Sequence, residues 1–351
     1  MILRKGRLYL VIAILIISVI ISGCTAERRP REVQPERTGQ QVTQVPEATH
    51  QGKSEGSQQV KKPDLPEPIS TEGNKEPSLK VYIVQEKQVK EMPFEDYVAG
   101  VVAGEIKNDW PLEAIKAQAI IARTFVLQFI DEKGRSKYEN AHVSTDIEEA
   151  QAWNEEAVND RVKKAVKDTR GQVIVYNGEF ARTWFHSNAG GKTATPKEGL
   201  NFKGEDPPYI QVVDSPDMNE AVEADAKSWT ATFPKDEVIA ALKEAGKPVK
   251  DFSSISIGQK GPSGRAVTIS FDGTEVSAAE LRLALGTTEM RSTLLDNIAL
   301  EGGNVVMSGR GYGHGVGLSQ WGAYNMAKNG KSAEEIINYY FKDINIVKMW
   351  Q

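Results

Sequence analysis

Three stretches of the sequence carry side chains that could perform acid–base chemistry or bind a polar ligand. Glu105 continues an apolar helical stripe, His186 and Ser187 open the segment HSNAGGKT, and His314 lies within GRGYGHGVG, residues 309–317. An unpaired carboxyl group on an apolar face is costly to ionise, so its pKa rises and it can serve as an acid. We therefore expect the three stretches to meet in one cleft.

The glycine-rich stretch has glycine at every second position from Gly309 to Gly317. In an extended segment these glycines would share one face, and the bare backbone there would be approached closely by something else. Either a packed neighbouring element or a ligand satisfies that requirement. Tyr312, His314 and Trp321 add aromatic and hydrogen-bonding surface that can stack on sugar rings, and His314 favours the ligand.

The elements that must position Glu105 are two helices within residues 94–129. The first carries an apolar stripe at helical spacing, formed by Phe94, Tyr97, Val98, Val101 and Val102. Glu105 is the next position on that stripe. Asn108 or Asp109 can cap the second helix, with Pro111 near its first turn.

The second helix has an inner stripe bordered by two cations, Lys116 and Arg123. Its stripe residues are Leu112, Ile115, Ala119, Ala122 and Val126. Two packed helices would then present one carboxyl group and two cations to a common space. The alternative is a structural hairpin in which Glu105 simply pairs with Arg123, since structural ion pairs also perturb pKa values.

The remaining elements mix helices and strands without regular alternation, which favours an α+β fold. Asn177-Gly178 predicts a type I′ hairpin whose second strand carries His186 into a cleft, although a solvated histidine at a surface turn is the alternative. The expected strands cover 79–89, 172–176, 179–185, 252–257 and 266–271, and the expected helices cover 155–169, 229–245, 319–328 and segments starting at Ser277 and Ser332. A smaller subdomain could span 217–300.

The N-terminal segment indicates export and membrane attachment. Arg4, Lys5 and Arg7 precede an apolar run from Leu8 to Ile21, as in a signal peptide over residues 1–23. The run ends before Cys24 in the sequence ISGC, which resembles a bacterial lipobox and implies diacylglyceryl attachment at Cys24. An uncleaved signal anchor is the alternative. The expected location is the outer face of the cell membrane, toward the cell wall.

Residues 24–78 are predicted to be a disordered tether to a folded domain over 79–351. Residues 25–78 contain seven prolines and no aromatic residue, so they cannot bury enough apolar surface to fold. The chain has a formal net charge of −5, and its basic N-terminal segment leaves the rest more acidic still. That charge argues against nucleic acid as a partner.

Other catalytic or cofactor sites have weak support in the sequence. His142, His186 and His314 could be zinc ligands, but no spacing such as HxxxH or HExxH occurs. Asp146 could complete a triad with a histidine and Ser187, but the G-x-S-x-G elbow is absent. The letters GGKT lack the glycine spacing of a phosphate loop. We expect neither a metal nor another cofactor.

The folded region resembles the SpoIID/LytB domain family over residues 79–351. The motifs that carry the resemblance, in collinear order, are EDYVAGVVAGEI, WPLEAIKAQAIIARTF, FHSNAGGKT, PYIQVVDSP, SGRAVTI, ELRLALG and GRGYGHGVGLSQWGA. The resemblance implies a lytic transglycosylase that cuts the MurNAc–GlcNAc bond of peptide-stripped glycan and acts with a cell-wall amidase in sporulation. Members of the LytB type are described as amidase enhancers.

Carried over by position, the resemblance makes Glu105 the catalytic acid. The residues that it associates with activity or substrate binding are Lys116, Arg123, His186, Ser187, Tyr312, His314 and Gln320. Burial must then outweigh the two cations in setting the pKa of Glu105, and those cations should face the lactyl carboxylate of MurNAc. Two departures are evident: no cysteine accompanies His142 for the zinc that some members bind, and a lipobox replaces the usual transmembrane anchor.

Overall fold

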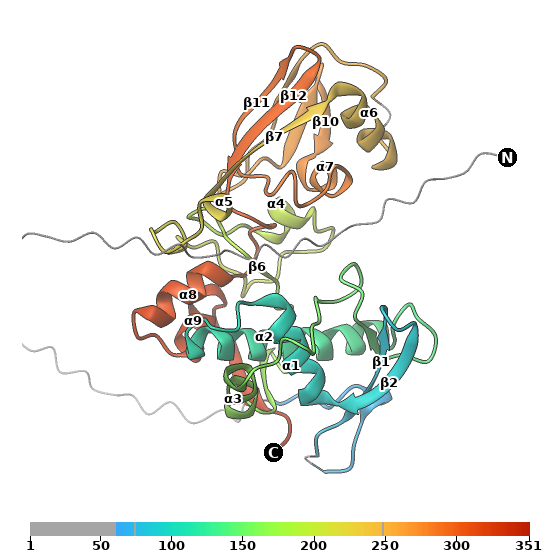
Figure 1. Ribbon diagram of the computed structural model, residues 1–351, viewed down its shortest axis with the longest axis vertical. Helices are drawn as coiled ribbons and strands as arrows, with labels where there is room; N and C mark the ends of the chain where they lie inside the picture. The colour runs from blue at the N-terminus through green and yellow to red at the C-terminus, as the bar shows by residue number, and fades with distance from the viewer. Residues whose placement is uncertain (1–60, 74, 248) are drawn as a thin grey trace, which may run out of the picture. The chain divides into compact units, whose positions relative to one another are not determined.

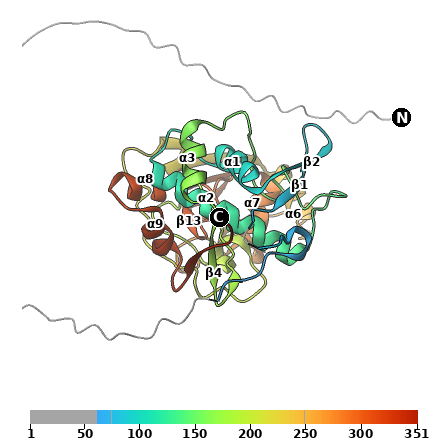
Figure 2. The same ribbon diagram turned by 90° about the horizontal axis from the view of Figure 1, so that it is seen from below.

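The two central helices begin and end close to the predicted residues. The structure is a computed structural model that describes residues 61–73, 75–247 and 249–351. Helix α1 (Phe94–Glu105) buries its apolar stripe, and α2 (Leu112–Lys133) packs against it (Figures 1 and 2). The predicted cap at Asn108 or Asp109 is wrong, because Pro111 itself occupies the N-cap and no side chain caps the helix.

Strands form small sheets of two or three members rather than one large sheet. The described strands are β1 (Ser78–Ile83), β2 (Gln88–Pro93), β3 (Val143–Ser144), β4 (Gln172–Tyr176), β5 (Glu179–Phe180), β6 (Phe185–His186), β7 (Ser228–Pro234), β8 (Ile255–Ile257), β9 (Thr268–Phe271), β10 (Thr274–Ser277), β11 (Leu295–Glu301), β12 (Asn304–Arg310), β13 (Leu318–Ser319) and β14 (Asn345–Lys348). The sheets have the orders β2-β1-β3, β14-β4-β5, β13-β6, β11-β12-β7 and β10-β9-β8.

Short helices connect and cover these sheets. They are the 3₁₀ helix η1 (Glu67–Ile69) and the α-helices α3 (Asp160–Asp168), α4 (Pro196–Leu200), α5 (Ala224–Lys227), α6 (Lys235–Glu244), α7 (Ala278–Leu285), α8 (Gln320–Lys328) and α9 (Ala333–Tyr340). Helix α9 has the full capping box of Ser332 and Glu335, whereas at α7 only the Ser277 half forms. At α7, Glu280 accepts a hydrogen bond from the side chain of Asn201 and does not complete a capping box with Ser277. The mixture confirms the α+β class.

The predicted hairpin forms, but its second strand is shorter than expected. Asn177 and Gly178 have φ of 51° and 85°, as a type I′ turn requires. Strand β5 ends at Phe180, so the strand predicted over 179–185 is wrong beyond that residue. The chain leaves this sheet and re-pairs as β6, parallel to β13, with His186 opposite Ser319.

The predicted helix over 229–245 is a strand followed by a helix. In β7 the residues alternate between buried and exposed, with Trp229, Ala231 and Phe233 inside, which is the period of a half-buried strand. Figure 1 shows β7, β12 and β11 side by side. A separate hydrophobic cluster draws its residues from Trp229 to Met307, beyond the end of the predicted subdomain.

The N-terminal boundary of the folded part lies earlier than predicted. Ile69 is 4% exposed and joins the core cluster of α1 and α2. Glu76 accepts a hydrogen bond from the backbone N–H of Glu95. Residues 61–73 and 75–78 therefore belong to the fold. The predicted signal peptide, Cys24 and most of the tether lie outside the described residues, and no helix within the described ranges is long and apolar enough to span a membrane.

Candidate active site

One cleft of about 450 Å³ gathers most of the residues that the sequence singled out. Its walls come from the end of α1, from the loop before Trp153, from β6, from α7 and from the glycine-rich loop after β12. The lining residues are Glu105, Phe125, Ile147, Ala150, Gln151, Trp184, Phe185, His186, Ser187, Arg282, Tyr312, Gly313, His314 and Gln320. The predicted meeting of the acid, the histidines and the glycine-rich loop is thus present in the fold.

Glu105 is half-buried at the C-terminal end of α1. Its Oε1 accepts a hydrogen bond of 2.6 Å from the backbone N–H of Ala152. Burial raises the pKa of this carboxyl to about 7, and the Ala152 N–H opposes that shift. No cation among the described residues contributes to the shift. Near neutral pH the group is therefore partly protonated, and since Oε1 is already an acceptor, Oε2 is the oxygen that carries the proton.

Two glycines of α1 bring the Ala152 N–H to the acid. A side chain at Gly100 would collide with the indole of Trp153, and one at Gly104 would lie 2.8 Å from the backbone nitrogen of Trp153. Because these helix positions lack side chains, the segment before Trp153 can lie against them. The next residue, Asn154, donates its N–H to the carbonyl of Gly100 at 2.9 Å.

The backbone of Val316 fixes the tautomers of both histidines. Its carbonyl accepts from Nδ1 of His186 at 3.1 Å, so Nε2 of His186 carries a lone pair. Its N–H donates to Nδ1 of His314 at 3.0 Å, so the proton of the neutral His314 ring is on Nε2. The buried Nε2 of His186 has no partner among the described residues. Neutral His186 thus offers an unused hydrogen-bond acceptor.

Both histidines stay uncharged across the physiological pH range. Burial lowers the pKa of His186 well below its usual value, and the nearby His314 and Arg265 add to that effect. Burial, Arg282 and Arg265 lower the pKa of His314 to about 3. The ring centroids lie 5.6 Å apart. The pair can therefore orient hydroxyl groups, but it offers no proton near pH 7.

The glycine-rich loop is not the extended ribbon that its alternation predicted. Gly311, Gly313, Gly315 and Gly317 have φ of 77°, 113°, 83° and 71°, so each occupies the left-handed region that other residues avoid. Protein atoms approach most of them closely: a side chain at Gly315 would collide with the guanidinium of Arg265, and one at Gly317 with the carbonyl of Trp184. The packed neighbouring element is therefore confirmed, whereas approach of a ligand stays a prediction, at Gly313, which also lines the cleft.

Backbone contacts hold the loop, β6 and α8 together around the cleft. Asn188 and Tyr312 exchange two hydrogen bonds of 2.9 and 2.8 Å, and the carbonyl of Ser187 accepts from the N–H of Trp321 at 3.0 Å. Gln320 donates from Nε2 to the carbonyl of Glu105 at 2.9 Å. Gln320 therefore ties the start of α8 to the end of α1, and its other contact is with Gln118.

Asp217 is a supporting residue that the sequence analysis missed. It is fully buried and accepts from the N–H groups of Ala189 and Gly191 at 2.7 and 2.8 Å. It also accepts from the hydroxyl of Ser319 at 2.6 Å. These bonds fix the turn after Ser187 to the start of α8. The motif PYIQVVDSP ends just before Asp217, so only the fold assigns its role.

We expect Asp217→Asn to lower the free energy of unfolding by about 1–3 kcal/mol, because an amide cannot accept from all three buried donors. Denaturant-induced unfolding measures this loss. Asp251→Asn is the matched control, since Asp251 forms an exposed ion pair with Lys235 and should cost less than about 1 kcal/mol. Equal stability of the two variants would contradict the assigned role.

Two predicted substrate-binding cations do not reach the cleft. Lys116 pairs with Glu113 at 2.9 Å and with Asp168 at 3.1 Å. Arg123 is fully buried and pairs with Glu95 at 2.6 Å. The expectation that they share a space with Glu105 is wrong, because the helix faces that bear them turn toward α3 and β4 instead. The alternative pairing of Arg123 with Glu105 is wrong as well.

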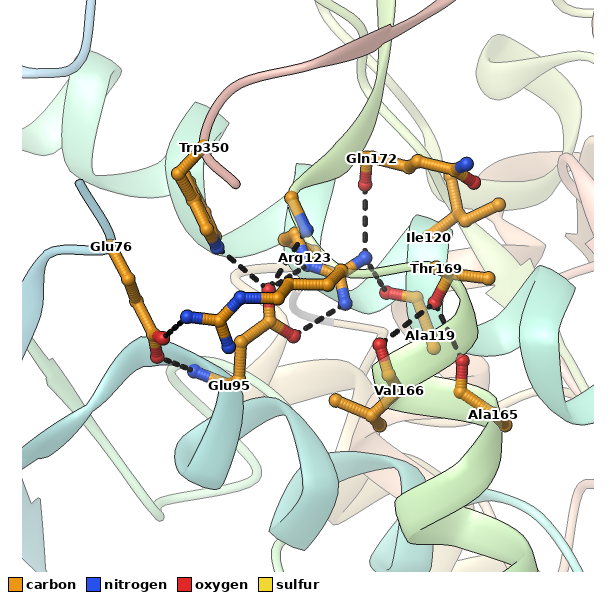
Figure 3. A network of polar contacts seen from close by, with 12 residues as sticks. Glu76, Glu95, Ala119, Ile120, Arg123, Ala165, Val166, Thr169, Gln172 and Trp350 are labelled. Carbon is orange, nitrogen blue, oxygen red and sulfur yellow. Dashed lines mark hydrogen bonds and ion pairs between the residues drawn. The ribbon is translucent and has the colours of Figure 1, made fainter. Parts of the chain in front are cut away.

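Glu95 is the centre of a structural network (Figure 3). Its Oε1 accepts from Nε of Arg123 at 3.1 Å, from the N–H of Gly171 at 2.9 Å and from the indole of Trp350 at 2.9 Å. Arg123 donates further to the carbonyls of Gln172 and Ala119. The network therefore joins α1, α2, the start of β4 and the C-terminal segment.

His142, which was considered for a zinc site, and Asp146, which was considered for a catalytic triad, make local contacts away from the cleft lining. His142 accepts a hydrogen bond from the N–H of Lys80 at its Nδ1. Asp146 pairs with Lys137 and accepts a hydrogen bond from the hydroxyl of Tyr138, and these contacts lower its pKa to about 2. Across the described residues, no three histidine, cysteine or acidic side chains gather as a metal would need.

Two further lining residues were not expected from the sequence. Gln151 is 2% exposed, and neither polar atom of its carboxamide has a partner within the described chain. Arg282 is 9% exposed. Arg282 lies within the motif ELRLALG, but the leucines of that motif indicate an ordinary buried helix and gave no reason to single out the arginine. Gln151 follows a polar segment in which no sequence pattern indicated a functional site.

Comparisons with known proteins extend over most of the described chain. A family model described as "Stage II sporulation protein" matches residues 82–176, and a domain of unknown function matches residues 210–317. An uncharacterized protein of Brachyspira hyodysenteriae is 33% identical over 260 residues, which cover 74% of this chain and 68% of that protein.

Two named relatives come from Bacillus subtilis. Stage II sporulation protein D is 28% identical over 288 residues, which cover 77% of this chain and 78% of the relative. An amidase enhancer is 26% identical over 294 residues, which cover 69% of this chain but 39% of the enhancer. The first family match includes Glu105, whereas the second includes Arg282, Tyr312 and His314.

Proposed function

Because the chain belongs to the SpoIID/LytB domain family, we propose that it is a lytic transglycosylase acting on the MurNAc–GlcNAc bonds of peptidoglycan, with Glu105 as the acid and base. The observation that carries the proposal is the carboxyl of Glu105, whose pKa is about 7, in one cleft with His186 and the glycine-rich loop. A carboxyl group with this pKa can both give and take a proton at neutral pH.

The proposed reaction needs one carboxyl group. Protonated Glu105 gives its Oε2 proton to the glycosidic oxygen as the bond from that oxygen to C1 of MurNAc breaks. The resulting carboxylate takes the proton of the C6 hydroxyl, and the C6 oxygen forms the new bond to C1. The product is a 1,6-anhydro end, no water is consumed, and Glu105 is protonated again. Ordinary glycosidases need a second carboxylate because their nucleophile is not part of the substrate.

In this proposal the other polar side chains that line the cleft contact the sugar or hold the acid, and none of them gains or loses a proton. Nε2 of His186 is an acceptor for a sugar hydroxyl, and its neutrality avoids a charge that would lower the pKa of the acid. Tyr312 offers a ring face and a hydroxyl to the sugar, and Ser187 offers a hydroxyl. The hydrogen bond from the Gln320 side chain to the backbone carbonyl of Glu105 holds the acid in place. Mass spectrometry of digested peptide-free glycan tests the proposal, which predicts anhydro-ended fragments.

We expect activity to fall as the pH rises through about 7, because ionised Glu105 has no proton to donate. The profile of kcat/KM should be flat from about pH 5 to 6 and fall about tenfold per unit well above pH 7. The histidines add no acidic limb in this range, since the pKa of His314 is about 3 and that of His186 is also far below its usual value. Activity that rises through pH 7 would refute the acid role.

The similarity to an amidase enhancer favours a second candidate function. In that case the cleft binds glycan without cutting it, and the protein stimulates a cell-wall amidase. Glu105→Gln would then still enhance a purified amidase on intact cell wall. A catalytic requirement predicts that this enhancement disappears together with the anhydro-ended fragments.

Export and lipid attachment at Cys24 remain part of the proposal. They rest on the apolar segment and the ISGC sequence before the tether. Cys24→Ser should abolish incorporation of labelled fatty acid and release the protein from the membrane fraction. A variant that stays membrane-bound would support the uncleaved anchor instead.

A further inference from the structure

Arg282 of α7 is a buried cation in the wall of the cleft. Its side chain is 9% exposed, and its Nε donates to the carbonyl of Arg291 at 3.0 Å. Within the described ranges, no carboxylate lies at ion-pair distance from its guanidinium, and Tyr312 is the one group that favours its charged form. Its two terminal nitrogens make no hydrogen bond to any of the described residues.

The arginines that are fully buried within the described residues are balanced by acids. Arg123 has Glu95. Arg265 has the nearby charges of Glu198 and Asp217, and it donates to the carbonyls of Lys192 and Ala189 at 2.8 and 2.6 Å. Arg282 differs from both, and a buried charge without a counter-ion is costly to maintain. A negatively charged ligand bound at Arg282 would offset this cost.

The cation, the acid and the histidine pair line the same cleft. Arg282 lowers the pKa of His314 and of His186, whereas it makes no contribution to the raised pKa of Glu105. A guanidinium with two free terminal nitrogens matches the two oxygens of a carboxylate.

We propose that Arg282 binds a carboxylate of the glycan substrate through its terminal nitrogens and so selects strands that carry one. This inference rests on the proposed glycan-binding function, and it gives Arg282 the role that the sequence had led us to expect of Lys116 and Arg123. The carboxylate can come from the lactyl group of MurNAc or from a stem peptide. A lactyl group joined to a peptide is an amide and has no charge.

Equilibrium binding to a non-cleaving protein tests the proposal separately from catalysis. The full-length chain with Glu105→Gln is titrated calorimetrically with peptide-free MurNAc–GlcNAc strands, with peptide-bearing strands and with chitooligosaccharides, which lack carboxylates. Adding Arg282→Gln should weaken binding of the peptide-free strands about 10- to 100-fold, the range for a hydrogen bond between charged groups. Binding of chitooligosaccharides should stay unchanged.

Two further variants separate charge from folding. Arg282→Lys keeps the charge but loses the two-pronged geometry, so its affinity should be intermediate. Arg182→Gln removes a cation that pairs with Glu132 outside the cleft lining, and it should bind as the parent does. In the parent, added salt should weaken binding of peptide-free strands but not of chitooligosaccharides. That comparison needs no substitution at Arg282.

The measured affinities distinguish a lactyl carboxylate from a peptide carboxylate, and they also show whether Arg282 binds a carboxylate at all. Loss of affinity confined to peptide-free strands assigns the lactyl carboxylate, and loss confined to peptide-bearing strands assigns a peptide carboxylate. Equal loss for chitooligosaccharides, or no loss for any ligand, overturns the proposal. If Glu105 proves not to be catalytic, these binding results still stand, so the two failures are distinguishable.

Discussion

Glu105→Gln is expected to abolish release of anhydro-ended fragments, lowering the rate by at least about 10²- to 10⁴-fold, the range for loss of a general acid–base group. The amide retains an oxygen that can accept from the N–H of Ala152, so the local geometry persists. It has no proton to donate to a glycosidic oxygen. Product analysis by mass spectrometry on peptide-free glycan measures the effect.

The control for this variant is Glu205→Gln, an exposed residue outside the cleft lining with the same change of charge. It should retain full activity. Thermal unfolding should show that Glu105→Gln is folded, and the variant should be slightly more stable at alkaline pH, since it buries no carboxylate. Unchanged fragment release by folded Glu105→Gln would end the transglycosylase proposal.

Arg123→Met is expected to lower the free energy of unfolding by about 3–5 kcal/mol, since it leaves Glu95 buried without its cation. The carbonyl of Gln172 would lose its donor as well. Denaturant titration measures this loss. The size of the effect reflects the position of the pair at the junction shown in Figure 3, where Glu95 also holds Gly171 and Trp350.

A control and a second readout keep this prediction specific. Arg182→Met removes an exposed ion pair with Glu132 and should cost less than about 1 kcal/mol. Below its unfolding transition, Arg123→Met should bind chitooligosaccharides as the parent does. Normal stability with lost glycan binding would instead restore Arg123 to the substrate site.

Local patterns in the sequence were sufficient for several elements. The apolar stripe from Phe94 predicts α1 and places Glu105 at its end, and Asn177-Gly178 predicts the type I′ turn that forms. Ser332 and Glu335 predict the capping box of α9. Each of these signals depends on residues within a few positions of one another, so the chain need not be folded for the pattern to be recognised.

Other expectations failed where a distant partner decides the structure. The sequence predicts one strand over 179–185 that carries His186 at its end, but His186 pairs with Ser319 in another sheet. The alternating glycines predict an extended ribbon, whereas close contacts from Arg265 and Trp184 accompany a turned backbone. Lys116 and Arg123 border the right helix but pair with acids on other elements.

By itself, then, the sequence determined the helix that carries the acid, the α+β class and the family to which the chain belongs. Only the tertiary structure decided which charges are paired: Lys116 and Arg123 form ion pairs, whereas no carboxylate among the described residues lies at ion-pair distance from Arg282. The physical reason is that the energy of a charge depends on its burial and on neighbours that are remote in the chain, and these are set only when the elements pack.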